Sequence, residues 1–491
     1  MPRRTLVVGL AMATTITGLT VPGAAAEQAT VKFPSSDFPL GARPALTKTV
    51  TSVSPGIDLY DVQAGSSTDG YTVTVLMPNG RDAGKRRAAE TVLAEVEAAG
   101  EVAGMQRLIR PQVADAPEQE LFMVRVGLWP FEQRAKADKM ARKLKQAGLK
   151  VKVDYLGDDG LKTTGPWHVK VLMVDARTFR GSYAASLGTS VAKRETVSSM
   201  ARRDGAIAAV NGGFFNIRTA RHWQGDPVGV SVVGGRLLSE AVPGRSAIVL
   251  RGRTARITEL ETRITLISQD GAQAPVSGVN RAAAENELVL YTEEWGSKTP
   301  KVDGTDVVID ADGQVEAVRA PGAAVPKGKR VLHGSGEAGM WLNEHAWEGW
   351  KVTVDTKVRD LRKKRTLKLT PDLHIVSGGV GLVRNGQTKI TAKRDGHDSL
   401  NMILRRHPRT LVGTTRDGSL ILATVDGRKP GVTVGANFHE AAQLMRWLGA
   451  TQAINLDGGG STAMVVKNKV VNKPSDGRER AVGDALLVLP H

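Results

Sequence analysis

Residues 454–466 read INLDGGGSTAMVV, two apolar segments joined by one acidic residue, three glycines and two hydroxyl side chains. Glycine at the end of a strand is unfavourable unless the backbone needs unusual angles or a ligand approaches it closely. The stretch is therefore either a tight hairpin turn or part of a binding site. The rest of the chain decides between these two interpretations.

Three further stretches share this design, because each is a polar, glycine-bearing turn that follows an apolar segment with the pattern of a strand. The four turns begin at Asn211 (NGGFFN), Ser377 (SGGVG), Asp426 (DGR) and Asp457 (DGGGST). Four turns of one design predict neighbouring strands whose ends meet at one cleft. Glycine N–H groups there can form a concavity that holds an anion.

The sequence around these turns predicts one large α+β domain at residues 165–491, rich in strands arranged in mixed sheets. Short apolar runs bounded by glycine and polar residues indicate the strands, and 3.6-residue periodicity indicates the helices. Strands are expected at 168–174, 206–210, 229–233, 247–250, 352–356, 374–377, 410–414, 420–425, 453–456 and 485–489, and helices at 196–203 and 437–448. Residues of about 236–370 are less patterned and predict an inserted strand-rich subdomain.

The first 65 residues predict a leader and a linker. Arg3 and Arg4 precede an apolar run over 6–21, and the alanines at 24–26 suit signal peptidase. Residues 1–26 therefore predict a Sec signal peptide and a secreted or cell-wall associated protein. No later apolar run reaches the roughly 18 residues that a membrane-spanning helix needs. Residues 27–65, rich in proline, serine and threonine, predict a linker with one short strand near 57–62.

Residues 66–157 contain two strand–helix–strand patterns, which predict a small sheet with two helices on one face. The second copy is the clearer one: FMVRVGLW at 122–129 is followed by a basic helical stretch, Gly148 and LKVKVDY at 149–155. This half resembles the sporulation-related repeat (SPOR) domain. The resemblance implies binding of peptidoglycan glycan strands on the sheet face, although LMPNG at 76–80 departs from the pattern; a degenerate accessory domain is the alternative.

Composition limits the classes of function. Cysteine is absent, which excludes disulfides, thiolate nucleophiles and cysteine-bound zinc in the chain. The formal net charge of +17 suits an acidic polymer outside the cell, such as a phosphate-bearing wall polymer. Nucleic acid is the competing partner, but zinc-finger spacing and RNP-like aromatic strands are missing, and no nucleic acid is expected.

Two charged residues outside the glycine turns are candidates for chemistry. Arg409 follows Pro408 at the start of a predicted strand, so a rigid backbone would aim its guanidinium, which can fork onto a phosphate. Glu440 lies in the first turn of a predicted helix, where a carboxylate commonly complements the helix dipole instead. The sequence HDS at 397–399 is interpreted as a solvent-facing loop rather than a triad. The G-x-S-x-G, Walker, HExxH and dinucleotide-binding motifs are absent.

Eight short motifs occur in the order of the phosphodiester glycosidase family, and the region 165–491 resembles that family. The motifs are NGGFF at 211–215, SGG at 377–379, RNG at 384–386, RTLVG at 409–413, DG at 426–427, EAA at 440–442, NLDGGGST at 455–462 and PSD at 474–476. The resemblance implies hydrolysis of a sugar C1–O–phosphate bond. It implies the fold and the class of bond, but not the sugar or the aglycone.

The resemblance and the residue chemistry together name a site. Because the leaving group is a phosphate, the site needs a place for developing phosphate charge and a carboxylate, rather than a strong acid. The expected catalytic groups are Asp457, Asp426, Arg409 and Glu440, and the expected substrate-binding groups are Asn211, Gly212, Gly213, Ser377, Gly378, Thr410, Gly458, Gly459, Gly460, Ser461 and Thr462. The roles of the three carboxylates stay open.

No cofactor is expected, although a structural Ca²⁺ or Mg²⁺ near Asp457 would suit its oxygen ligands. Two other functions remain open at this stage. One is a non-catalytic protein that binds peptidoglycan or a wall polymer through its basic surface and small domain. The other is a hydrolase that uses Ser461 as its nucleophile.

Overall fold

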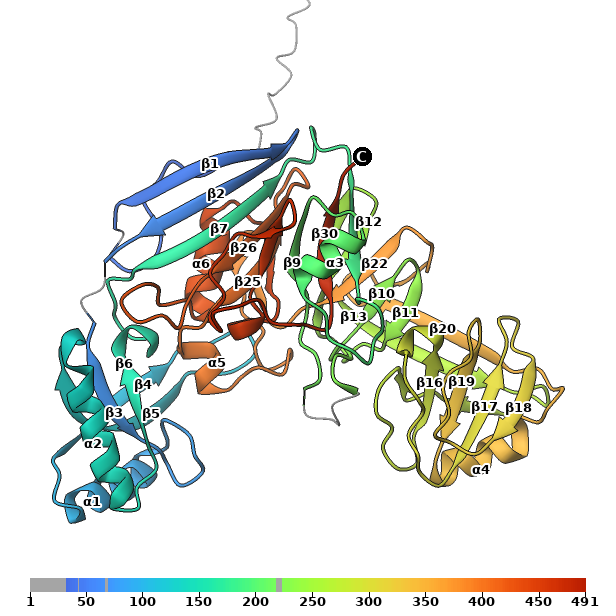
Figure 1. Ribbon diagram of the computed structural model, residues 1–491, viewed down its shortest axis with the longest axis horizontal. Coiled ribbons are helices and arrows are strands. Elements are labelled where there is room, and N and C mark those ends of the chain that lie inside the picture. The colour runs from blue at the N-terminus through green and yellow to red at the C-terminus, as the bar shows by residue number, and fades with distance from the viewer. Residues whose placement is uncertain (1–31, 43, 67–68, 218–222) are drawn as a thin grey trace, which may run out of the picture.

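The structure is a computed structural model of the chain, and it describes residues 32–42, 44–66, 69–217 and 223–491. The predicted signal peptide at 1–26 lies outside the described residues. The described part is strand-rich, with several sheets and few helices, so the prediction of an α+β class is confirmed (Figure 1). Each strand and helix expected for the large domain is present.

Two sheets packed face to face form the centre of the large domain. The first has eight strands in the order β1-β2-β7-β26-β25-β27-β23-β24, and the second has five in the order β29-β28-β9-β30-β8. The first sheet consists of β1 (Leu46–Ser54), β2 (Ile57–Ala64), β7 (Trp167–Val174), β26 (Leu420–Val425), β25 (Arg409–Thr414), β27 (Gln452–Asn455), β23 (Gly381–Arg384) and β24 (Gln387–Thr388). The second consists of β29 (Lys469–Val470), β28 (Met464–Val466), β9 (Ala208–Asn211), β30 (Ala485–Leu489) and β8 (Ser182–Ser186). Val412 and Ile454 of the first sheet share one buried cluster with Val210 and Leu486 of the second.

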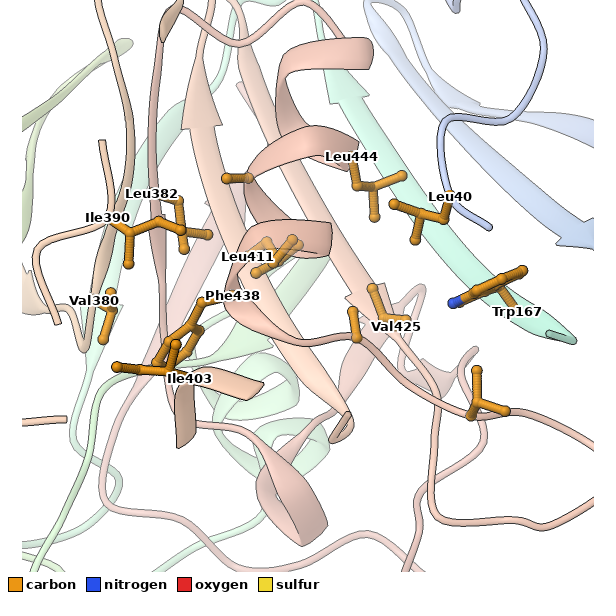
Figure 2. Packing of buried hydrophobic residues seen from close by; sticks show 14 of the residues in the cluster. Leu40, Trp167, Val380, Leu382, Ile390, Ile403, Leu411, Val425, Phe438 and Leu444 are labelled. Atoms are coloured by element: carbon orange, nitrogen blue, oxygen red, sulfur yellow. The ribbon is translucent and has the colours of Figure 1, made fainter. Parts of the chain in front are cut away.

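A helix covers the outer face of each sheet, because alternate strand residues are apolar on both sides. Helix α6 (Phe438–Trp447) lies on the first sheet, where Phe438 and Leu444 pack over Leu411 and Val425 (Figure 2). Helix α3 (Val197–Arg203) covers the second sheet. The centre is therefore four layers thick, and its strand ends are held on both sides.

A third sheet extends from the centre and carries the insertion. Its order is β11-β10-β22-β12-β13-β20-β21, with β14 paired to β13. These strands are β11 (Arg236–Ser239), β10 (Ser231–Val233), β22 (Leu373–Ser377), β12 (Ser246–Arg251), β13 (Thr254–Ile267), β20 (Thr353–Asp360), β21 (Arg365–Leu367) and β14 (Gln273–Pro275). The long strands β13 and β20 lead to a separate five-stranded sheet with its own core.

The inserted sheet is smaller than the expected region 236–370, because both ends of that region belong to the third sheet. Its strands run in the order β15-β16-β19-β17-β18, and helix α4 packs on β17 and β19. The elements are β15 (Gly278–Val279), β16 (Leu288–Thr292), β17 (Thr305–Ile309), β18 (Val315–Arg319), β19 (Arg330–Gly334) and α4 (Gly336–His345). Figure 1 shows this insertion and the small N-terminal domain at opposite ends of the molecule.

The small domain has the two strand–helix–strand halves that the sequence predicts. Its antiparallel sheet has the order β4-β5-β3-β6, with two helices packed against it. The elements are β3 (Tyr71–Val75), α1 (Arg86–Ala98), β4 (Ala103–Arg110), β5 (Gln119–Trp129), α2 (Arg134–Gln146) and β6 (Val151–Tyr155). Membership of the SPOR family stays a prediction.

The prediction that residues 27–65 form a linker is wrong for the described part of that segment. Strands β1 and β2 form a hairpin at the edge of the first sheet, and β2 pairs with β7 along its whole length. Phe38 and Leu40 are almost completely buried, and Trp447 of α6 donates a hydrogen bond to the Ser36 hydroxyl. Frequent proline and serine hid a segment in which Phe38, Leu40 and Ile57 are buried.

Among the described residues, no helix has the length and apolar character that crossing a membrane requires.

Replacement of Ile57 by alanine tests the assignment of the hairpin to the domain core. Ile57 is 1% exposed and packs in the cluster between the two central sheets. We expect the free energy of unfolding to fall by about 2–4 kcal/mol, because a buried cavity forms. Val50 on β1 is 60% exposed, so Val50→Ala is the matched control and should change the stability little. Equal, small effects of both changes in a denaturant titration would contradict this packing.

Candidate active site

Strand register brings three of the predicted site residues to one edge of the first sheet. β25 is antiparallel to both of its neighbours, Arg409 pairs with Val425, and Leu411 pairs with Asn455. Arg409 therefore begins its strand where Asp426 and Asp457 follow the ends of theirs. The expected convergence of these turns is confirmed.

Asn211 joins this edge to the second sheet. Its side-chain oxygen accepts hydrogen bonds from the Thr410 hydroxyl at 2.6 Å and from the Ala463 N–H at 3.1 Å. Its side-chain nitrogen donates to the Asp457 carbonyl at 2.9 Å. Asn211 and Thr410 are both fully buried. The prediction that they bind substrate directly is therefore replaced: they fix the positions of the strand ends, and their polar atoms are used within the protein.

Asp457 is the carboxylate of this edge that remains partly exposed. Its Oδ1 accepts a hydrogen bond from the Gly458 N–H at 2.8 Å, and its own N–H donates to the Gly212 carbonyl. Burial raises the pKa of Asp457 to about 6, against the opposing effects of the Ser461 hydroxyl, the Gly458 amide, Arg480 and Arg409. The Asp457 side chain is therefore mainly ionised at neutral pH.

A second carboxyl group lies behind Gly212, and sequence reasoning missed it. Asp484 is 1% exposed, and neither of its side-chain oxygens has a hydrogen-bond partner. A β-carbon placed on Gly212 would lie 2.3 Å from Asp484 Oδ1, so glycine is required there. Burial, with a contribution from the charge of Asp457, raises the pKa of Asp484 to about 7, against the effect of the Gly213 amide. No glycine-rich motif surrounds Asp484, which precedes β30, so its sequence context gave no signal.

Two arginines lie against the glycine loop that follows Asp457, and a third, Arg409, lies close enough to Asp457 for their charges to interact. A β-carbon on Gly459 would lie 2.9 Å from an Arg428 nitrogen, and one on Gly460 would lie 2.0 Å from an Arg480 nitrogen. Arg409 is 1% exposed, with its guanidinium carbon 4.2 Å from the centre of the Phe438 ring. Burial and the charge of Arg428 lower the pKa of Arg409 to about 9. The guanidinium groups thus concentrate positive charge at this loop.

Few acidic groups balance these arginines. Arg480 forms an ion pair with Asp476 at 2.6 Å. Arg409 instead donates to the backbone carbonyls of Met402 and Ala436, each at 3.0 Å. Burial and the charge of Arg480 lower the pKa of Arg428, against Asp158, Asp476 and Asp457. An anionic ligand at the loop would relieve this repulsion.

His407 orients Arg428. Arg428 donates to Nδ1 of His407 at 3.1 Å, and an arginine can only donate, so Nδ1 carries no proton. The proton therefore lies on Nε2, which donates to Asn401. Burial and the charges of Arg409 and Arg428 lower the pKa of His407 to about 3, which keeps the ring neutral.

Asp426 is buried and holds a neighbouring loop. It is 2% exposed and accepts hydrogen bonds from the Asn472 side chain and from the Lys473 N–H. Asn472 in turn donates to the Thr462 carbonyl at 3.1 Å. Burial raises the pKa of Asp426 to about 6. Its predicted catalytic role is therefore replaced by a supporting role for the loop that contains Ser461 and Thr462.

The prediction that Glu440 is catalytic is wrong. Its carboxylate forms an ion pair with Arg406 at 2.7 Å, and it accepts the N–H of Asn437 in a capping box at the start of α6. Both oxygens are therefore used in stabilising the helix and the Arg406 segment. The helix-dipole interpretation describes this residue better.

The SGG turn supports the site by close packing. A β-carbon on Gly213 would lie 2.4 Å from the Ser377 carbonyl oxygen, and one on Gly378 would lie 2.8 Å from that of Ser246. Ser377 is 1% exposed, so its predicted contact with substrate has no support from its position. The same packing explains why glycines occur at these turns.

His397 is not the solvent-facing residue that the sequence indicates. Its ring stacks on Phe214 with centroids 4.2 Å apart. Burial and the charges of Arg245 and Arg409 lower the pKa of His397 to about 4. The imidazole is therefore neutral and packs against Phe214 near Arg409.

Within the described ranges, no group of three or more histidine, aspartate or glutamate side chains has the spacing of a metal site. A Ca²⁺ or Mg²⁺ at Asp457 stays a prediction.

Residues 303–489 match the family model described as phosphodiester glycosidase. Mouse N-acetylglucosamine-1-phosphodiester alpha-N-acetylglucosaminidase is 33% identical over 116 residues, which span 22% of this chain and 22% of the mouse protein. The SPbeta prophage-derived uncharacterized protein YomE of Bacillus subtilis (strain 168) is 37% identical over 110 residues, 22% of this chain and 16% of YomE. The chain thus spans less than a quarter of the length of these curated relatives.

A crystal structure of a Burkholderia pseudomallei K96243 protein, named for its expected export, is similar over almost the whole chain. The TM-score is 0.82 at 28% sequence identity, and the alignment covers 94% of this chain and 99% of the other. The fold and the arrangement of its parts are therefore shared with a solved structure.

Replacement of Asp484 by asparagine tests whether the charge of this buried carboxyl group lacks interactions that offset the cost of burying it. Its folded-state pKa of about 7 lies above the ordinary aspartate value of 3.8, so the carboxyl group destabilises the fold increasingly as pH rises between those values. We expect Asp484→Asn to raise the free energy of unfolding at pH 8 by up to about 4 kcal/mol, and to change it little near pH 4. Urea titrations at the two pH values measure this, with the exposed Asp303→Asn as control. An equal effect at both pH values would contradict the argument.

Proposed function

Because residues 303–489 belong to the phosphodiester glycosidase family, we propose that this chain hydrolyses a sugar 1-phosphodiester by cleaving the bond between C1 and the bridging oxygen. Water adds to C1, and the products are a free sugar and a phosphomonoester. The observation that carries the proposal is the positive charge beside Asp457: Arg428 and Arg480 lie against its glycine loop, and the charge of buried Arg409 interacts with Asp457. A phosphodiester supplies the negative charge that this loop lacks.

The chemistry of the leaving group agrees with the groups at the site. A phosphomonoester has a second pKa of about 6, so it leaves with little help from a proton donor. Arg409, Arg428 and Arg480 would stabilise the charge that develops on it. The carboxylate of Asp457, ionised at neutral pH, would assist the attacking water or stabilise the positive charge at C1.

Buried Asp484 would limit the negative charge beside Asp457. With a pKa of about 7, it holds a proton over the range in which Asp457 has already ionised. Two like charges at one buried site are unfavourable, so one proton shared by the pair keeps Asp457 as the charged member.

We propose a phosphate-bearing wall polymer or other extracellular glycopolymer as the substrate. The net charge of +17 favours binding to an acidic polymer. The signal-like first 26 residues and the expected export of the Burkholderia relative support an exported protein. A serine hydrolase acting through Ser461 is less favoured, because Ser461 is 1% exposed and its hydroxyl lies beside the Asp457 carboxylate.

Replacement of Arg428 by methionine tests the anion site. The change removes one of three charges that stabilise the leaving phosphate, so we expect kcat/KM for a p-nitrophenyl sugar phosphodiester to fall by about 10²–10³-fold. Arg416→Met, at an exposed position in the turn between β25 and β26, is the control and should have normal activity. Unchanged kinetics of Arg428→Met would remove this arginine from the site.

The pH dependence of kcat/KM tests the role of Asp457. If its ionised form is required, the rate should fall as pH falls through about 6, because protonation neutralises the carboxylate. Asp457→Asn should lower kcat/KM by about 10²–10⁴-fold and abolish that acidic limb. If Asp457→Asn kept the native kcat/KM and its fall at acidic pH, another group would be the catalytic carboxylate.

A further inference from the structure

The small domain presents its free sheet face to the large domain rather than to solvent. On that face Thr72 and Thr74 are at most 2% exposed, and Leu121 and Met123 share a buried cluster with Leu404 of helix α5 (Leu400–Leu404). This is the face on which the resemblance to SPOR domains places glycan. Binding of glycan there would require the two domains to separate.

Arg405 is the centre of the contact. Its guanidinium donates to both carboxylate oxygens of Asp154 on β6, at 2.8 and 2.5 Å, and also pairs with Asp82. Thr74 donates to the same Asp154 carboxylate at 2.8 Å. Arg405 and Asp154 are each at most 7% exposed. Separation of the domains would leave buried charges without partners, which is strongly unfavourable.

Arg406 forms a second connection from the next position of the chain. Its N–H donates to the Asp158 carbonyl at 3.1 Å, and its guanidinium donates to the carbonyls of Gly157 and Leu161. The same guanidinium pairs with Glu440 at the start of α6. Residues 405 and 406 are therefore fixed between the small domain and the central helix.

The fixed segment leads directly into the anion site. After Arg406 the chain continues through His407 and Pro408 to Arg409. The Pro408 carbonyl accepts the N–H of Gly459 at 2.9 Å, within the glycine loop. His407 accepts a hydrogen bond from Arg428. A shift of this segment would therefore move Arg409, Arg428 and the loop together.

The small domain also supports the turn after β26, which carries Arg428. The Tyr155 hydroxyl accepts the N–H of Gly431 at 3.3 Å, and a β-carbon on Gly431 would lie 2.6 Å from the Phe131 ring. The charge of Asp158 opposes the lowering of the Arg428 pKa that burial and Arg480 cause. The segments that carry Arg409 and Arg428 are thus in contact with the small domain.

We infer that the small domain is a fixed part of the active site, and that Arg405, Asp154 and Phe131 are positioning residues for the arginines that bind phosphate. The inference rests on the proposed function. The small-domain elements from β3 to β6 make up over a sixth of the chain, so the 94% alignment with the Burkholderia crystal structure must include much of this domain, and the TM-score of 0.82 indicates the same arrangement.

Asp154→Asn and Phe131→Ala in the full mature chain test the inference. We expect each variant to remain folded by circular dichroism, and kcat to fall by about 10–100-fold, because misplaced arginines stabilise the leaving phosphate poorly. The affinity for inorganic phosphate, measured by calorimetry, should fall in parallel. Glu120→Gln, which removes an exposed ion pair with Arg107 on the same domain, is the matched control and should keep both values.

Two results would overturn the inference: folded variants with normal kcat and phosphate affinity, or a loss shared equally by Glu120→Gln. Phosphate affinity separates this inference from the proposed function. If the native protein binds phosphate but hydrolyses no sugar phosphodiester, the proposed function fails, while the comparison of phosphate affinities still tests positioning. Phe131 is 37% exposed, so Phe131→Ala keeps the test valid should Asp154→Asn fail to fold.

Discussion

The buried amide of Asn211 is the interaction on which the geometry of the site depends. It joins Thr410, Asp457 and Ala463, which lie 199 to 252 residues away from it in the sequence. Because Asn211 is fully buried, each of these hydrogen bonds forms in a low-dielectric environment. A polar group left without a hydrogen-bond partner there would cost folding free energy. The two central sheets are thereby held so that their strand ends share one edge. Asp457, Arg428 and Arg480 are then placed at a loop of glycines, with Arg409 buried nearby.

The charges at this edge oppose stability. Arg409, Arg428 and Arg480 repel one another, and Asp484 is buried without a hydrogen-bond partner. Such groups persist where the surrounding structure holds them, and they commonly mark functional sites. Here the capping box of α6, the Asn472 network and the small domain supply that support. The small N-terminal domain thus supports the site through its contacts with the segment that leads to Arg409.

The sequence predicted the elements and the convergence of the turns, because both depend on local patterns. Alternating apolar residues identified the strands, and glycines at 212, 378 and 458 identified turns that approach other backbone closely. Individual roles depended on three-dimensional contacts that spacing does not encode. Glu440 is typical of a helix start and pairs with Arg406. Arg428 ends the DGR turn but had no role assigned from the sequence, and Asp484 lies in a stretch with no distinctive pattern. The predicted strand near 57–62 is present as β2, but β1 and the pairing of the hairpin with β7 were missed because the composition of residues 27–65 resembles a linker.

Hydrolysis in water enriched in oxygen-18 tests the central claim most directly. Purified wall polymer or a defined sugar 1-phosphodiester is incubated with the mature protein, and both products are analysed by mass spectrometry. Cleavage between C1 and oxygen, as proposed here, places the heavy isotope on the released sugar and leaves the phosphomonoester unlabelled. The label on the phosphate would instead show attack at phosphorus, and the protein would then be a phosphodiesterase rather than a glycosidase.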